Sequence, residues 1–157
     1  MFEAFPPLSG KSPSTLILGT FPSPLSRSRF EYYGNPKNQF WHIIFDVFCV
    51  PFENPTYAEK ADVLAKNGLA LWDTLVRCEV EGALDSSIKN PVYNTSIPAF
   101  VTKNGISRVL FNGGNAYKFY KRGIGKIEPL ILPSTSPANA RLRYSEKLEL
   151  WRTALLT

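Results

Sequence analysis

The segment that decides the fold is TLILGTFPS at residues 15–23. Its first part, residues 15–18, is a short apolar run typical of a buried strand, and Gly19 closes it. The strand passes directly into a turn that contains Thr20, Phe21, Pro22 and Ser23. A buried strand that ends in a turn with polar side chains is typical of a sheet that binds a ligand at its edge.

Further apolar runs at residues 69–72, 109–111 and 127–132 predict three more strands. Between and after them, helical spacing predicts helices over residues 38–48, 57–66, 97–104, 116–121 and 144–155. Strands that alternate with helices indicate an α/β fold, here a three-layer α/β/α arrangement around a mainly parallel, four-stranded sheet.

The remaining segments predict loops. Residues 1–13 are rich in Pro and Ser and predict an exposed lead-in, and residues 21–37 predict a long loop of the kind that carries function. Residues 79–94 are polar and also predict a loop. The chain has 157 residues, the size of one domain, so we expect a single domain over residues 1–157.

Polar turns follow each predicted strand. They are Gly19–Ser23, Trp72–Asp73, Asn112–Gly114 and Pro133–Asn139. Because parallel strands end at the same edge of a sheet, we expect these four turns to converge on one binding site.

The composition allows a nucleic-acid partner without requiring one. The chain has 18 basic and 13 acidic side chains, a net charge of +5, and 13% aromatic residues. A positive balance suits a polyanion such as DNA or RNA, but it equally serves solubility. No uncharged apolar run is long enough to span a membrane.

The cysteine and histidine content argues against a metal centre. Cys49 and Cys78 are the only cysteines, and both lie in apolar contexts, which predicts buried thiols in a reducing compartment. Two cysteines and one histidine cannot build a four-ligand zinc site. We therefore expect no cofactor, and because no signal peptide is visible, a cytoplasmic protein.

A second informative segment is YYGNPKNQFW at residues 32–41. Asn38 stands where the helix of residues 38–48 is expected to begin. An Asn there is a preferred helix cap, and it can also present its carboxamide to a ligand. From the residues alone both roles remain open.

Four stretches in chain order resemble the hypoxanthine-DNA glycosylase branch of the uracil-DNA glycosylase superfamily. They are GTFPS (19–23), YYGNPKNQFW (32–41), LALWD (69–73) and LPSTSPAN (132–139). The resemblance runs from about residue 14 to residue 152, and NPKNQFW also resembles the mismatch-specific uracil glycosylases.

The resemblance implies hydrolysis of the N-glycosidic bond of a flipped-out deaminated base in DNA, as in base excision repair. In most of the superfamily the third place of the first loop holds Asp or Asn, but here it holds Phe21, which cannot polarise a water. In the hypoxanthine branch the catalytic Asn lies in the second stretch, at the position of Asn38. The resemblance therefore implies hypoxanthine as the base and Asn38 as the catalytic residue.

The expected base-binding residues are Gly19, Thr20, Phe21, Pro22, Tyr33 and Asp73. Phe21 and Tyr33 can sandwich a flat ring, although core packing is the commoner fate of an aromatic side chain. Asp73 can accept a hydrogen bond from the ring N–H of hypoxanthine, which adenine lacks. It can equally be a helix cap or a buried structural acid.

The residues expected to contact the DNA backbone or fill the gap left by the base are Ser23, Ser134, Ser136, Pro137, Asn139 and Arg141. The serines stand beside prolines, so they can bind phosphates or simply form turns. Arg27, Arg29 and Lys37 flank the first loop and can follow the phosphate backbone.

The leading hypothesis is a monomeric, monofunctional DNA glycosylase that uses water rather than a lysine Schiff base. The alternatives are a uracil or mismatch glycosylase on the same scaffold and a non-catalytic DNA-binding module.

Overall fold

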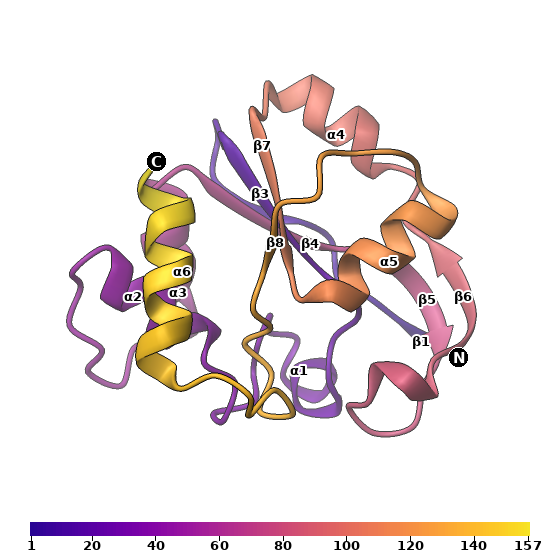
Figure 1. The fold of residues 1–157 in the computed structure, drawn as a ribbon, viewed down its shortest axis with the longest axis horizontal. Helices are drawn as coiled ribbons and strands as arrows, with labels where there is room; N and C mark the ends of the chain where they lie inside the picture. The colour runs from indigo at the N-terminus through magenta and orange to yellow at the C-terminus, as the bar shows by residue number, and fades with distance from the viewer.

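The central sheet of the computed structural model, which describes residues 1–157, has five strands. In spatial order they are β2 (Leu8–Ser9), β4 (Leu69–Asp73), β3 (Thr15–Gly19), β7 (Arg108–Asn112) and β8 (Ile131–Leu132). The four predicted strands are all present and parallel, and β2 adds an antiparallel edge beside β4. The predicted, mainly parallel sheet is therefore confirmed (Figure 1).

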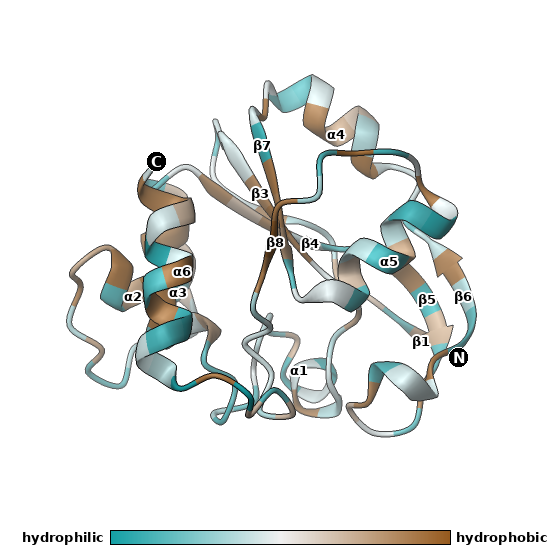
Figure 2. Cartoon of the chain, in the orientation of Figure 1, coloured by the Kyte–Doolittle hydropathy of each residue, from teal (hydrophilic) through white to brown (hydrophobic).

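Helices cover both faces of this sheet. The first side holds α2 (Phe40–Val47), α3 (Tyr57–Lys66) and α6 (Tyr144–Leu156), and the other holds α4 (Ile97–Asn104) and α5 (Gly114–Gly123). Alternate side chains of β3 point to opposite faces of the sheet. Ile17 packs in one core cluster, and Leu16 and Leu18 pack in the other. In Figure 2 the central strands are largely hydrophobic, whereas the loops at their lower ends are mostly hydrophilic or intermediate.

The first thirteen residues are mostly exposed or half-buried, as expected, but they are more than a lead-in because they form two strands. They contribute β2 to the central sheet and β1 (Phe2–Glu3) to a second, antiparallel sheet with β5 (Leu75–Glu79) and β6 (Lys89–Tyr93). β1 pairs with β5 and β2 pairs with β4, so each supplies hydrogen-bond partners to a strand that would otherwise lie at the edge of its sheet. A composition rich in Pro and Ser does not reveal this pairing.

The expected loop over residues 79–94 was wrong in part. It contains β6 and a short 3₁₀ helix, η1 (Asp85–Ser87). Pro91 argues against a central strand, but β6 lies at the edge of its sheet and pairs irregularly with β5, where proline is tolerated.

The long loop over residues 21–37 also contains a helix, α1 (Pro24–Arg29). Ser23 caps it by accepting a hydrogen bond from Ser26 N–H, and proline occupies its first position. Six residues are too few to show a helical period in the sequence.

Three further details differ from the sequence predictions. Helix α2 begins at Phe40 rather than Asn38, and β8 is limited to Ile131–Leu132. Cys78 is buried as expected, but Cys49 is exposed because it lies just beyond the end of α2, with a left-handed backbone. No helix of the chain combines the length and the apolar composition that crossing a lipid bilayer requires.

The core is tied to the loop after β8 through Trp151. This side chain is fully buried in α6, and its Nε1–H donates a hydrogen bond to the Pro133 carbonyl at 3.0 Å. Its ring also packs edge-on against Phe40, the first residue of α2. One side chain therefore connects the last helix, the first turn of α2 and the second polar loop.

We predict that Trp151→Phe lowers the free energy of unfolding by about 2–4 kcal/mol. The change leaves the Pro133 carbonyl without its donor and opens a small cavity in the core. Urea denaturation followed by fluorescence measures the loss. The matched control is Leu150→Ala on the same helix, where the leucine is 50% exposed, and an equal loss there would contradict the prediction.

Candidate active site

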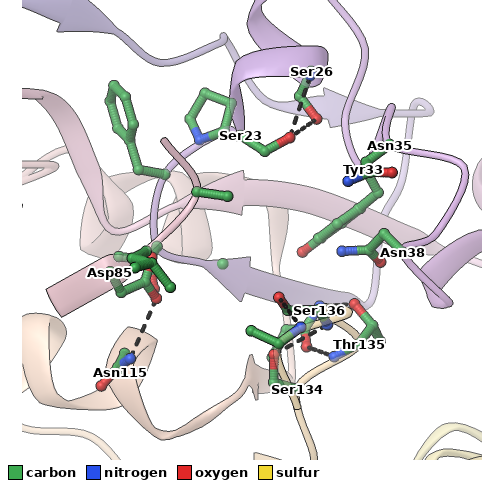
Figure 3. Close-up of a pocket in the computed structure, with 18 of the residues that line it drawn as sticks. Ser23, Ser26, Tyr33, Asn35, Asn38, Asp85, Asn115, Ser134, Thr135 and Ser136 are labelled. Atoms are coloured by element: carbon green, nitrogen blue, oxygen red, sulfur yellow. Dashed lines mark hydrogen bonds between the residues drawn. The ribbon is translucent and has the colours of Figure 1, made fainter. Parts of the chain in front are cut away.

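A cavity of about 460 Å³ lies at the carboxyl ends of the parallel strands. Residues from the ends of β3, β4 and β7 line it, together with the loop that follows β8. This is the convergence that the four polar turns predict. The segment between β5 and β6 closes another side and contributes Asp85 (Figure 3).

Asn38 points into this cavity from the turn before α2. Its Oδ1 accepts a hydrogen bond from Phe40 N–H at 2.9 Å, and its backbone N–H donates to the Asn35 carbonyl at 2.9 Å. Because Oδ1 is occupied, the amide nitrogen is the free end of the side chain, and it points into the cavity beside Tyr33 (Figure 3). Asn38 is therefore not the N-cap of α2, which is Gln39; its side chain closes the turn before the helix and presents a hydrogen-bond donor to the cavity.

Tyr33 forms one wall of the cavity. Its ring stacks on Phe40, with centroids 4.2 Å apart and planes 24° from parallel. Its backbone has a φ of 54°, in the left-handed region that few large residues adopt. Burial, reinforced by the negative charge of Asp73, raises the pKa of Tyr33 far above its usual value, so the phenol stays neutral.

Gly19 leaves room between Tyr33 and Asp73. A Cβ placed there would lie 2.7 Å from Asp73 Oδ1 and 3.1 Å from the Tyr33 hydroxyl. Any side chain would therefore displace both groups, which explains why the strand closes with glycine at this point.

Asp73 is the buried acid of the site. It is 4% exposed, and its Oδ2 has no hydrogen-bond partner. Burial, followed by the negative charge of Asp85, raises the pKa of Asp73 to about 7. An unpartnered buried oxygen is costly, so it is a position at which a ligand donor would be favourable.

Asp85 lies on η1 and accepts a hydrogen bond from Asn115 Nδ2 at 3.4 Å, at the start of α5 (Figure 3). Burial raises its pKa, while hydrogen bonds from Asn115 and Thr20 oppose that shift. The cavity therefore contains two carboxyl groups in a protein whose net charge is +5. No group of three or more His, Cys, Asp or Glu side chains is arranged to hold a metal ion.

The loop after β8 is shaped by its own serines. Ser134 Oγ accepts from Ser136 N–H, and Ser136 Oγ accepts from Ala138 N–H, both at 3.2 Å. These hydrogen bonds are of the kind expected if the serines simply form turns, which was one of the two roles predicted for them. Each hydroxyl still has a proton to donate, so the phosphate-binding reading also remains available.

This loop is fixed to the sheet by Thr135. Its N–H donates to Asn112 Oδ1, and Asn112 Nδ2 donates back to Thr135 Oγ1, both at 3.0 Å. The Thr135 carbonyl accepts Gln39 N–H, also at 3.0 Å. The residue next to Asn38 is therefore hydrogen-bonded to the second polar loop.

Twelve of the predicted site residues line the cavity. They are Gly19, Thr20, Phe21, Pro22, Ser23, Tyr33, Asn38, Asp73, Ser134, Ser136, Pro137 and Asn139. Arg141 does not line it and is exposed beyond the loop.

The basic residues near the first loop divide into two kinds. Arg27 donates to the Pro22 carbonyl and Arg29 to the Gly34 carbonyl, so both brace α1 and its surroundings rather than project freely toward a phosphate. Lys37 is exposed at the turn before Asn38.

Sequence reasoning missed Asp85 and Asn115 as residues of the site. Asn112 and Thr135 were not singled out, but they lie in two of the four turns that were expected to converge on it. No sequence signal marked Asp85 and Asn115, because only the folded segment between β5 and β6 brings Asp85 to the start of α5.

Comparison with known proteins places the chain in a family. No family model matches the chain. A hypoxanthine DNA glycosylase from Methanosarcina barkeri is 33% identical over 148 residues, which cover 92% of each chain. One from Methanosarcina acetivorans is 33% identical over 151 residues, 94% of each chain.

A solved structure supports the same conclusion. It is a solution NMR structure of a protein from Methanosarcina acetivorans described as a candidate uracil DNA glycosylase. It is 28% identical, has a TM-score of 0.77, and the match covers 98% of this chain and 95% of that one. With this fold, this cavity and relatives matched over nearly their whole length, the chain belongs to the hypoxanthine DNA glycosylase family.

Proposed function

We propose that this protein excises hypoxanthine from DNA by hydrolysing the N-glycosidic bond of a deoxyinosine flipped into the cavity. The observation that carries the proposal is the Asn38 carboxamide, whose oxygen is held by Phe40 N–H while its nitrogen faces the cavity. A base inside a duplex cannot reach such a group, so the nucleotide must leave the stack first.

Asn38 supplies a fixed donor to the reaction. As the bond between C1′ and the base nitrogen breaks, positive charge develops on the sugar and negative charge on the base. The amide N–H groups can stabilise the departing base or hold the attacking water. Because a neutral carboxamide is a weak base, its contribution is position and polarity rather than proton abstraction.

The walls of the cavity suit a flat lactam ring. Phe21 and Tyr33 can hold the ring between them, and the carboxyl of Asp73, which lines the cavity and has one oxygen without a partner, can accept the hypoxanthine N1–H. Adenine has a lone pair at that position, so it would face the ionised form of the Asp73 carboxyl without a hydrogen bond. Gly19 keeps the space between Tyr33 and Asp73 open.

Uracil is the second candidate base. It has a ring N–H beside an oxo group as hypoxanthine does, and the NMR structure of similar fold is described as a candidate uracil DNA glycosylase. Phe21, in place of a polar side chain, favours hypoxanthine, as the relatives' names do.

The loop with Ser134, Ser136, Pro137 and Asn139 is the proposed contact to the DNA backbone around the flipped nucleotide. Arg141, exposed just beyond the loop, is a candidate for filling the gap in the stack. We further propose that the protein acts as a monomer and in the cytoplasm, which the unpaired cysteines suit.

Incubation with a panel of duplexes tests the proposal directly. We expect a duplex with deoxyinosine to be cut only after heat or alkali, because hydrolysis leaves an abasic site and no strand break. Gel electrophoresis with and without alkali measures this. Cleavage of deoxyuridine alone would refute hypoxanthine as the base, and cleavage without alkali would refute the water-using mechanism.

We predict that Asn38→Ala lowers the single-turnover excision rate by about 10²–10³-fold, the usual cost of losing one preorganised donor. Binding of the deoxyinosine duplex, measured by fluorescence anisotropy, should change little. The matched control is Asn67→Ala, which removes a carboxamide that donates to the Val63 carbonyl at the end of α3, away from the cavity. Equal rates in Asn38→Ala and the wild type would exclude Asn38 as the catalytic residue.

The raised pKa of Asp73 makes stability depend on pH. Because the folded state holds this proton more tightly than the unfolded chain, the stabilisation is fully present below about pH 4 and is lost as the pH rises through about 7. We predict that the wild type loses roughly 2–4 kcal/mol relative to Asp73→Asn between about pH 4 and pH 8. Urea denaturation across this range measures the difference, with the exposed Asp62→Asn as control. If the free energy of unfolding changed with pH in the same way for the wild type and Asp73→Asn, the prediction would be contradicted.

A further inference from the structure

Lys147 is a buried lysine that takes part in no ion pair. It lies on α6 and is only 2% exposed. Its Nζ donates to two neutral oxygens, the Asn139 carbonyl at 2.7 Å and Gln39 Oε1 at 3.0 Å. Placing an ammonium group out of water without a counter-ion is unfavourable, so these two hydrogen bonds must hold it in place.

The two acceptors belong to the two loops that form the cavity. Gln39 directly follows Asn38, and Asn139 ends the stretch of the second loop that lines the cavity. The Gln39 N–H also donates to the Thr135 carbonyl, and Asn139 Nδ2 donates to the Ser134 carbonyl at 3.0 Å. The first of these bonds joins the two segments, and the second lies within the second loop. Lys147 is therefore a second connection between the two segments, and it is a charged one.

We propose that Lys147 is a positioning residue for catalysis, which clamps the turn that presents Asn38 to the loop that contacts the DNA. The inference rests on the proposed function in one respect, the catalytic role of Asn38. Lys147 does not line the cavity, and its burial keeps it from a phosphate, so it acts through Gln39 and Asn139 rather than on the substrate.

The clamp explains why a lysine is used. A lysine ammonium has three donors on a long stem, so one group can reach a side-chain oxygen and a backbone oxygen from different loops. A charged donor also forms stronger hydrogen bonds than a neutral one in a site of low polarity. A small shift of Asn38 would weaken its alignment with the sugar, because misplacement by about 1 Å can cost about 10²-fold in rate.

Lys147→Met tests the clamp, because methionine keeps most of the stem and removes the three donors. We expect the single-turnover excision rate on a deoxyinosine duplex to fall by about 10–100-fold. The Kd and its dependence on salt should stay close to the wild type, since no direct phosphate contact is lost. The matched control is Lys103→Met on α4, an exposed lysine on a helix that does not line the cavity, which should leave the rate unchanged.

A second variant and a double mutant separate positioning from general destabilisation. Gln39→Met removes only the acceptor on the Asn38 side, so it should reproduce the rate loss even if Lys147→Met folds poorly. In an Asn38→Ala background, Lys147→Met should cause almost no further loss. A wild-type rate in folded Lys147→Met, or an equal fold-loss in the Asn38→Ala background, would overturn the proposal.

Amide hydrogen exchange tests the clamp without relying on activity. In Lys147→Met we expect the Gln39 amide, which is bonded to the Thr135 carbonyl, to exchange at least about tenfold faster, while the amides of Ile17 and Leu110 in the central strands keep their rates. Unchanged exchange at Gln39 would reject the clamp. A wild-type protein that fails to excise hypoxanthine would instead reject the proposed function, and the exchange result would still decide the role of Lys147.

Discussion

The hydrogen bonds around Thr135 hold the site together. Thr135 exchanges two hydrogen bonds with Asn112 at the end of β7, and its carbonyl accepts the Gln39 N–H. A strand end, the second polar loop and the turn that carries Asn38 thus meet at one buried residue. The cavity depends on this junction because its opposite walls come from segments about 100 residues apart in the chain. Trp151 fixes the same loop to the core from the other side through the Pro133 carbonyl.

The protein as a whole is positively charged, whereas its cavity is lined by acidic side chains. The net charge of +5 suits a polyanion, whereas the cavity contains Asp73 and Asp85. Burial, followed by the negative charge of Asp85, raises the pKa of Asp73 to about 7, so this carboxyl is partly ionised at neutral pH. An acidic cavity would repel a phosphate, so we infer that the phosphates remain at the rim, near the serine-rich loop, while the uncharged base enters.

The sequence predicted the layers of the fold and most of the cavity because both follow from local patterns. Apolar runs mark β3, β4 and β7, and in a parallel sheet their ends must share one edge. What it missed depends on long-range pairing. The strands β1 and β2 have only two residues each and β6 contains Pro91, and all three form by pairing with the edge of another strand. Asp85 and Lys147 were missed for the same reason, since only tertiary contacts bring one to Asn115 and the other to Gln39.

The most direct test of the central claim is a crystal structure of the Asn38→Ala variant bound to a duplex that contains deoxyinosine. We expect the hypoxanthine ring inside the cavity, against Tyr33, with its N1–H within hydrogen-bond distance of Asp73. A base that stays stacked in the duplex would contradict it. So would a base that lies outside this cavity, for example in the neighbouring groove lined by His42, Phe52 and Lys60.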